Sequence, residues 1–153
     1  MSVNEILASL AGKWKGQNSL WLTWLPEPLK QSDSTMQVTL RANGQIIEFE
    51  YVWVYEGKLQ SGIMLLSGAP ESNTASGVWT DSWHSAHTLM MLAGKIDSQG
   101  NADLKGRYTV PDNPDWGWRI TVAPGDATLT LAMKNVSPEG AEDPAVEAIY
   151  FRA

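Results

Sequence analysis

The chain of 153 residues contains no cysteine, which excludes disulfide bonds, thiolate metal ligands and cysteine nucleophiles. This absence fits a reducing compartment. The first residues, MSVNEILASLAG, have neither the basic start nor the apolar core of a secretion signal, and no later stretch approaches the length of a membrane span. We therefore expect a soluble, cytoplasmic protein with no membrane span.

Positive charge is also scarce. The chain has 11 Lys and Arg residues against 17 Asp and Glu residues, its formal net charge is −6, and its basic residues are scattered singly. Binding to a nucleic-acid backbone depends on clustered Lys and Arg side chains that neutralise phosphates. We therefore expect no nucleic-acid partner.

The sequence lacks the common motifs of catalysis. It has no serine nucleophile elbow, no phosphate-binding loop and no pair of carboxylates at a convincing spacing. Ser82 stands beside Asp81 and near His84, but neighbouring residues on a strand point to opposite faces, so we expect that Asp81 does not orient His84. We predict no catalytic residues, and a binding protein is favoured over an enzyme.

Only two histidines are present, and both lie in the segment DSWHSAH. If this segment is a strand, His84 and His87 point to opposite faces, and a metal ion would need further ligands from elsewhere. We predict no metal site. We expect both histidines at a strand end or turn, bonded to water or a backbone carbonyl; the functional alternative places one of them at the border of a cavity mouth.

Tryptophan, in contrast, is abundant, with eight Trp residues against two Phe residues. An indole ring buries a large apolar area, but its N–H group needs a hydrogen-bond partner. This composition favours a broad aromatic cavity or platform. The alternative is that the indole rings simply fill the core.

The dominant pattern is alternation of apolar and polar residues at period two, interrupted by turn residues about every ten positions. It predicts about ten strands: Gly12–Trp24, Asp33–Arg41, Gln45–Tyr55, Lys58–Ser67, Thr74–Ser82, Ala86–Gly94, Asn101–Val110, Trp116–Ala123, Ala127–Asn135 and Ala145–Arg152. Only Val3–Leu10 has a helical pattern.

The regular spacing of these strands predicts consecutive antiparallel neighbours. An antiparallel sheet of about ten strands twists strongly and leaves two exposed edges, which closure into a barrel removes. The sequence has no linker, low-complexity run or long internal repeat. We therefore predict an all-β fold, a closed up-and-down antiparallel barrel with a short N-terminal helix, as one domain over residues 1–153.

Two of the predicted strands indicate which side chains face inward. In IIEFEYVWVY one face is aromatic and includes Tyr51 and Trp53, and we assign this face to the interior. In WGWRITV one face carries Trp116 and Trp118, whereas the other carries Arg119. The pattern leaves open which of these two faces is internal.

The motif Gly12-x-Trp14 at the start of the first strand, a meander of about ten strands and a final strand ending in YFR resemble the calycin barrels. That group includes lipocalins, fatty-acid-binding proteins and nitrobindin-like proteins. The resemblance implies that Trp14 packs across the closed end of the barrel and that Arg152 lies over its indole ring. A guanidinium group in that place gains cation–π attraction and donates hydrogen bonds to nearby carbonyls.

A closer resemblance covers nearly the whole chain. The segments LAGKWKG, GVWTDSW, LAGKIDSQGNADLKGRYTVPDNP, WRITV and AIYFRA, in this order, are similar to a bacterial calycin-like family catalogued as a domain of unknown function. The resemblance implies a fold, and the family has no settled activity that would carry over to this chain.

From these observations we expect the barrel to bind an apolar or amphipathic small molecule in its interior without transforming it. Buried area would supply affinity, and a few polar groups would supply selectivity. Asp81 and Arg119 are the polar candidates, with Arg119 holding a carboxylate or other polar head. The alternative is that they pair with each other across the wall or lie exposed. The predicted ligand-binding residues are Tyr51, Trp53, Trp79, Asp81, Trp83, His84, Trp118 and Arg119.

Other functions remain open at this point. A barrel filled by its own Trp side chains would be a structural or interaction module, with a surface patch around Trp21 and Trp24 as the binding surface, and a homodimer is left open. A haem cofactor is disfavoured because no histidine follows His87 and Met133 would be a weak axial ligand. An enzyme or haem protein that uses the segment Asp81–His87 is the third alternative.

Overall fold

The computed structural model describes residues 3–69, 71–85 and 87–153, with side chains from residue 5 onward. Among these residues it contains one helix, α1 (Val3–Ser9), and ten strands. The strands are β1 (Gly12–Trp21), β2 (Leu29–Arg41), β3 (Ile46–Tyr55), β4 (Lys58–Ala69), β5 (Thr74–Asp81), β6 (Met90–Ile96), β7 (Ala102–Tyr108), β8 (Trp116–Pro124), β9 (Thr128–Val136) and β10 (Glu142–Arg152).

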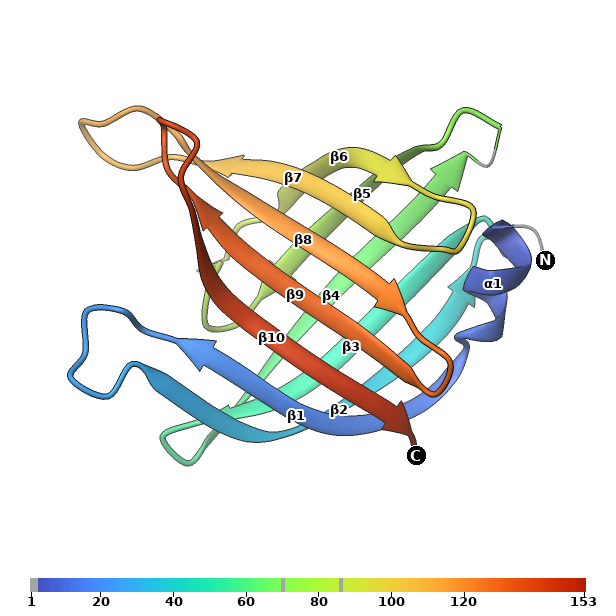
Figure 1. Ribbon diagram of the computed structural model, residues 1–153, viewed down its shortest axis with the longest axis horizontal. Helices are drawn as coiled ribbons and strands as arrows, with labels where there is room; N and C mark the ends of the chain where they lie inside the picture. Colours follow the sequence, from blue (N-terminus) through green and yellow to red (C-terminus); the bar gives the residue numbers. More distant parts are fainter. Residues whose placement is uncertain (1–2, 70, 86) are drawn as a thin grey trace.

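Each strand pairs antiparallel with its neighbours in sequence, and β1 pairs with β10, so the sheet closes (Figure 1). The closing pair runs from Trp14 opposite Arg152 to Leu20 opposite Val146. At Gly16, an added Cβ would lie 1.8 Å from the carbonyl oxygen of Ile149, so this crossing of β1 and β10 tolerates only glycine. The predicted fold class, a closed all-β barrel of about ten strands with a short helix, is confirmed.

Several strand boundaries differ from the prediction, and prolines account for two of the differences. The first strand ends at Trp21 rather than Trp24, because the loop that contains Pro26 and Pro28 turns the chain back, with Leu22 N–H bonded to Pro28 O. The last strand begins at Glu142 rather than Ala145, because a shift in register beside Pro144 accommodates a residue without an N–H donor. The predicted start of the sixth strand, Ala86, lies outside the described residues.

Helix α1 covers the end of the barrel where β1 begins and β10 ends (Figure 1). Its Leu7 is buried there together with Leu10 and Trp14, and the Trp14 indole N–H donates to Leu10 O at 2.9 Å. The Arg152 guanidinium lies 4.2 Å from the centre of the Trp14 ring and donates to Ala11 O and Ser9 O. The contact implied by the resemblance is therefore present.

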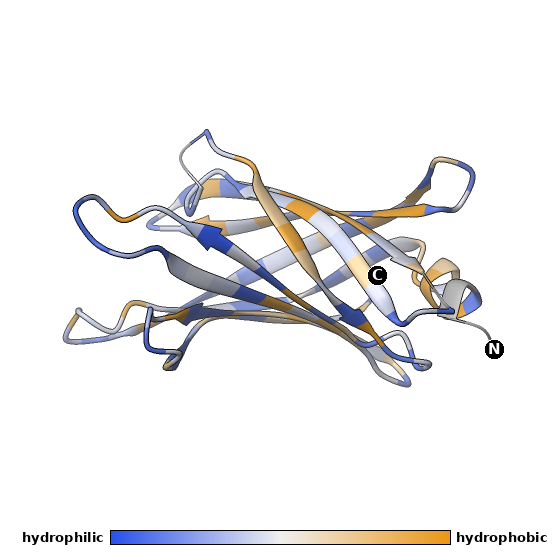
Figure 2. Cartoon of the chain, turned by 90° about the horizontal axis from the view of Figure 1, so that it is seen from above, coloured by the Kyte–Doolittle hydropathy of each residue, from blue (hydrophilic) through white to orange (hydrophobic). Residues whose placement is uncertain are grey.

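Because side chains alternate between the two faces of each strand, every second side chain points into the barrel and fills it. Figure 2 shows hydrophobic and hydrophilic residues interspersed along the strands. The expected inward face of β3 is confirmed, since Tyr51 and Trp53 are buried with Phe49. The largest side chains with almost no exposure are Tyr150, Phe49, Leu20, Met64, Leu66, Ile96, Leu104, Ile120, Leu129, Met133, Val38 and Val122. They fill the barrel between α1 and the opposite end.

Candidate functional site

Polar chemistry gathers at the end of the barrel opposite α1, which we call the mouth. Strands β3 and β5 end there, and β8 begins there (Figure 1). The segment after β5 folds as a turn rather than continuing the strand. This turn brings Trp83 and His84 onto the inward residues Trp53, Trp79 and Trp118.

Asp81, the last residue of β5, is the buried charge of the mouth, with a side chain that is 1% exposed. Its Oδ2 accepts hydrogen bonds from the Tyr51 hydroxyl at 2.7 Å and from the Trp53 indole N–H at 3.3 Å. Its Oδ1 accepts from the backbone N–H groups of Trp83 and His84, and lies 3.1 Å from His84 Nδ1. Burial by itself raises the pKa of Asp81, but hydrogen bonds from His84, from the Tyr51 hydroxyl and from the Trp83 backbone N–H hold the pKa below its ordinary value.

The sequence DSWHS builds this geometry locally. Asp81 caps the turn through its own side chain, as aspartate commonly does. Ser85 fixes the other side of the turn, because its N–H donates to Asp81 O and its hydroxyl accepts from Asp81 N–H, both at 3.0 Å. The expectation that Asp81 does not orient His84 was therefore wrong: β5 ends at Asp81, and strand alternation no longer applies to the residues that follow.

His84 is enclosed by indole rings. Its ring centre lies 4.7 Å from that of Trp83, 5.5 Å from Trp118, 5.8 Å from Trp53 and 5.9 Å from Trp79. Because the ionised Asp81 carboxylate is only an acceptor, His84 Nδ1 carries the proton of their hydrogen bond. In the neutral ring Nε2 is then a bare acceptor. This atom is buried and has no hydrogen-bond partner among the described residues.

Trp118 carries the second unpartnered polar atom of the mouth. Its side chain is buried, and its indole N–H has no partner among the described residues. The Trp118 ring stacks on Trp79 with centres 5.5 Å apart and planes 12° apart. Trp79 differs from Trp118, because its N–H donates to the Tyr51 hydroxyl at 2.9 Å, and Tyr51 in turn donates to Asp81.

His84 and Trp118 line the same pocket, which has a volume of about 530 Å³. Its other lining side chains include Thr88, Met90 and Tyr108, none of which was predicted. Tyr108 was detectable as an inward position of an alternating strand, but Thr88 lies in a turn and has no periodic signal. Two residues of this aromatic wall therefore carry an unpartnered polar atom just behind the pocket surface.

The predicted ligand-binding role of Arg119 is wrong. It lies on the outer face of β8, where it donates to Asp103 from Nε and Nη2 and to Glu142 from Nη1. The face of β8 that carries Trp118 points inward instead. Neither the predicted pairing of Arg119 with Asp81 nor its role as an anchor inside the barrel holds, because the partners of Asp81 are Tyr51, Trp53, Trp83 and His84.

The other candidates divide between the mouth and the outside. Trp83 is half-buried and packs edge-on against Tyr55, with ring centres 5.3 Å apart. The expected surface patch is smaller than predicted, because Leu22 is buried and Trp24, at 73% exposure, is the exposed indole of that loop. Within the described part of the chain, no group of three or more His, Cys, Asp and Glu side chains is arranged to hold a metal ion.

Together, the closed ten-stranded sheet, the helix over one end and the aromatic pocket at the other define a small closed barrel protein. Over residues 2–152 the chain matches the family described as a protein of unknown function, DUF1579, and it belongs to that family. This match confirms the resemblance to a family catalogued as a domain of unknown function. The comparison with curated proteins finds no match. Among the described residues, no helix has both the length and the apolar character needed to cross a membrane.

Proposed function

We propose that this protein binds an amphipathic small molecule at the mouth of the barrel, with the polar head of the ligand held by His84 and Trp118, and that it does not transform the ligand. One observation carries the proposal: His84 and Trp118 line one pocket, and each has a buried polar atom, Nε2 and the indole N–H, without a hydrogen-bond partner among the described residues. A buried polar group without a partner is costly, typically by about 1–3 kcal/mol, and a ligand that bonds both removes that cost.

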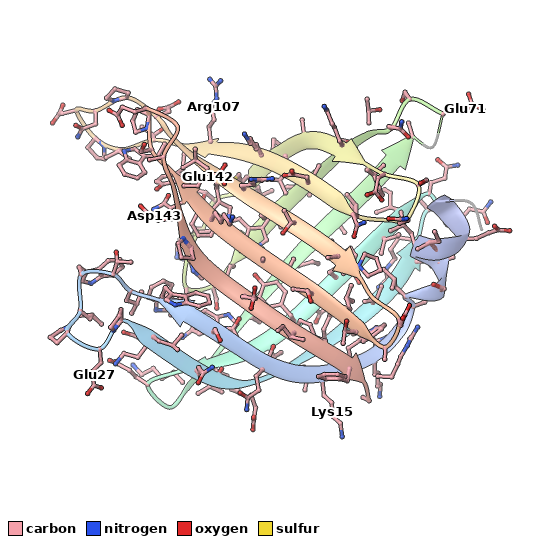
Figure 3. The ribbon with its side chains drawn as sticks, in the orientation of Figure 1. Lys15, Glu27, Glu71, Arg107, Glu142 and Asp143 are labelled. Carbon is pink, nitrogen blue, oxygen red and sulfur yellow. The ribbon has the colours of Figure 1, made fainter. Side chains whose placement is uncertain are left out.

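Charge favours a neutral head over an anionic one. Asp81 already places a buried carboxylate against His84, and a second carboxylate in the pocket would be repelled by it. Among the described residues, no Lys or Arg side chain is buried, so none of them offsets a ligand charge in the pocket. Arg107 borders the pocket, but its side chain points away from the barrel (Figure 3). A hydroxyl or primary amide supplies both a donor for Nε2 and an acceptor for the indole N–H.

Three probes with the same chain and different heads test the proposal: 1-decanol, decanamide and decanoate. Their titration against intrinsic Trp fluorescence at pH 7 is expected to give saturable binding of the alcohol and the amide, and weaker binding of decanoate. Trp118→Phe keeps the ring but removes the donor, and His84→Phe keeps a ring but removes the acceptor. Each variant is expected to weaken decanamide binding by about three- to tenfold, the equivalent of one hydrogen bond.

Trp24→Phe is the matched control, because it removes an exposed indole far along the chain from the pocket residues. It is expected to leave the affinity unchanged. Absence of saturable binding by all three probes contradicts the proposal, as does equal binding by wild type and both pocket variants. Inclusion of haemin in the same assay separates the haem alternative, which requires an absorbance change that is lost in His84→Phe.

A structural or interaction module is the second candidate. It is favoured by the side chains that fill the barrel between α1 and the mouth, and by the exposed Trp24. In that case Trp24→Phe would weaken association with a partner, and the three probes would not bind. The homodimer and the cytoplasmic location stay predictions.

A further inference from the structure

The hydrogen-bonded ladder between β6 and β7 ends before the mouth. The two strands are paired only from Ala93 opposite Lys105 to Ile96 opposite Ala102. Strand β6 continues toward the mouth to Met90, and β7 continues to Tyr108, but these ends form no ladder. The neighbouring boundaries stay paired over the same levels, since β5 pairs with β6 as far as Met90 and β7 pairs with β8 as far as Tyr108.

The unpaired stretch borders two hollows. One is the mouth pocket, and the other is a groove of about 1160 Å³ beside β6, β7 and β8, whose lining includes the outward-facing Met91 and Lys105. Leu89, Met90, Arg107 and Trp118 line both. The same gap in the ladder therefore borders both Trp118 and the groove, which we call the outer groove.

Met90 occupies the gap. An added Cβ on Gly106 would lie 2.6 Å from both Cγ and Sδ of Met90 and 2.9 Å from the backbone oxygen of Met91. The missing side chain of this glycine therefore leaves the space that Met90 fills, and the two backbones stay close without the ladder hydrogen bonds. Methionine has three rotatable bonds and no branch, so it moves at little cost. The side chain that separates the pocket from the groove is therefore one of the most adaptable types.

The groove carries apolar side chains that are exposed to water. Leu89 is 72% exposed and Met91 is 73% exposed, and both line the groove near Trp116. An alkyl chain laid over these side chains would remove their apolar surface from water. Charged side chains, among them Lys105 and Asp115, lie along the same groove, so an apolar chain there would have a polar border.

We propose that the gap between β6 and β7 is a lateral portal gated by Met90, through which a single-chain amphiphile places its head in the mouth pocket and its alkyl tail in the outer groove. This inference rests on the proposed function, because it needs a head held by His84 and Trp118. It specifies the ligand further: a neutral head on an unbranched alkyl chain long enough to cross the wall. Affinity is expected to rise about three- to fourfold for each methylene that reaches Leu89 and Met91.

The absence of cysteine makes a disulfide lock a clean test. In Met91→Cys/Arg107→Cys, the two cysteines stand where the ladder would continue, so oxidation closes the gap. The control Ala93→Cys/Lys105→Cys links positions that are already paired. Stopped-flow Trp fluorescence with 1-decanol is run on the oxidised and reduced forms of each protein. Oxidation is expected to slow association by about tenfold or more in the first pair and to have no effect in the second.

Met90→Ala provides a second measurement that does not depend on a disulfide. With the gate removed, the association and dissociation rate constants are both expected to rise by about fivefold, while their ratio changes much less. Where the first cysteine pair stays reduced under conditions that oxidise the control, Met90→Ala decides.

The portal is overturned if neither oxidation of the Met91→Cys/Arg107→Cys pair nor Met90→Ala changes the rate constants of 1-decanol binding. If 1-decanol then still binds and Trp118→Phe still weakens it, the mouth site stands and only the portal fails. If 1-decanol does not bind wild type, the proposed function fails as well.

Discussion

At the scale of single residues, Asp81 determines the chemistry of the mouth. Asp81→Asn keeps the shape but removes the charge that accepts bonds from Tyr51, Trp53 and His84. Hydrogen bonds to a charged group typically contribute about 1.5–3 kcal/mol, so we expect a loss of that order in the free energy of unfolding at pH 7. Denaturant titration measures the loss, with exposed Asp126→Asn as the control.

This loss depends on pH with a defined sign. The pKa of Asp81 is lowered in the folded state, so the stabilisation by its charge is fully present above the unfolded pKa of about 4 and disappears as pH falls through the folded pKa. The stability difference between wild type and Asp81→Asn is therefore expected to shrink below about pH 4. A difference that stays unchanged from pH 5 to below pH 3 would contradict the ionised Asp81.

Arg119, unlike Asp81, is a charged residue that lies outside the mouth site. It pairs with Asp103 and Glu142 on the outer face, and exposed ion pairs typically contribute about 0–1 kcal/mol. We expect Arg119→Ala to leave decanoate and decanamide binding unchanged and to reduce stability only slightly. A selective loss of decanoate binding, measured by the same fluorescence titration, would restore Arg119 as an anchor for an acidic head.

At the scale of elements, the junction of α1, β1 and β10 closes the end opposite the mouth. Arg152→Ala removes the stacked cation and its two bonds to the carbonyls of Ser9 and Ala11, and we expect it to reduce the unfolding free energy by about 2–3 kcal/mol. Arg152→Lys is expected to recover less than half of this, because an ammonium group lacks the planar fork of donors. The measurement is chemical unfolding.

Lys15→Ala is the control for that junction, since Lys15 lies on β1 with its side chain directed outward (Figure 3). Equal stability of wild type and Arg152→Ala would show that the guanidinium does not hold the end of the barrel. The junction was predictable from sequence because Gly12-x-Trp14 and the terminal arginine resemble a known arrangement.

Other elements carried less information in the sequence. Alternation identified the inward face of β3, where one face is aromatic and the other includes Glu48 and Glu50. It did not select the inward face of β8, because Trp118 and Arg119 both have reasons to be inside a ligand-binding barrel. Period-two reasoning also failed past Asp81, where the side-chain hydrogen bonds of Asp81 and Ser85 turn the chain.

At the scale of the whole molecule, closure was predictable and the site was predictable only in part. Turn spacing and alternation specify ten antiparallel neighbours, and edge avoidance then specifies a barrel. The unpartnered atoms of His84 and Trp118, in contrast, depend on which neighbours come within hydrogen-bond distance, and no local pattern encodes such an absence. The loss of pairing between β6 and β7 likewise has no signal in either strand alone.

The most direct measurement of the mouth site is a nitrogen–proton correlation spectrum of the indole N–H groups during titration with decanamide. The Trp118 signal, assigned through its loss in Trp118→Phe, is expected to move downfield to saturation as its free N–H gains an acceptor, while the signal of exposed Trp24 stays in place. If the Trp118 signal is unmoved at saturating ligand, or if no indole signal responds, the mouth is not where this protein binds.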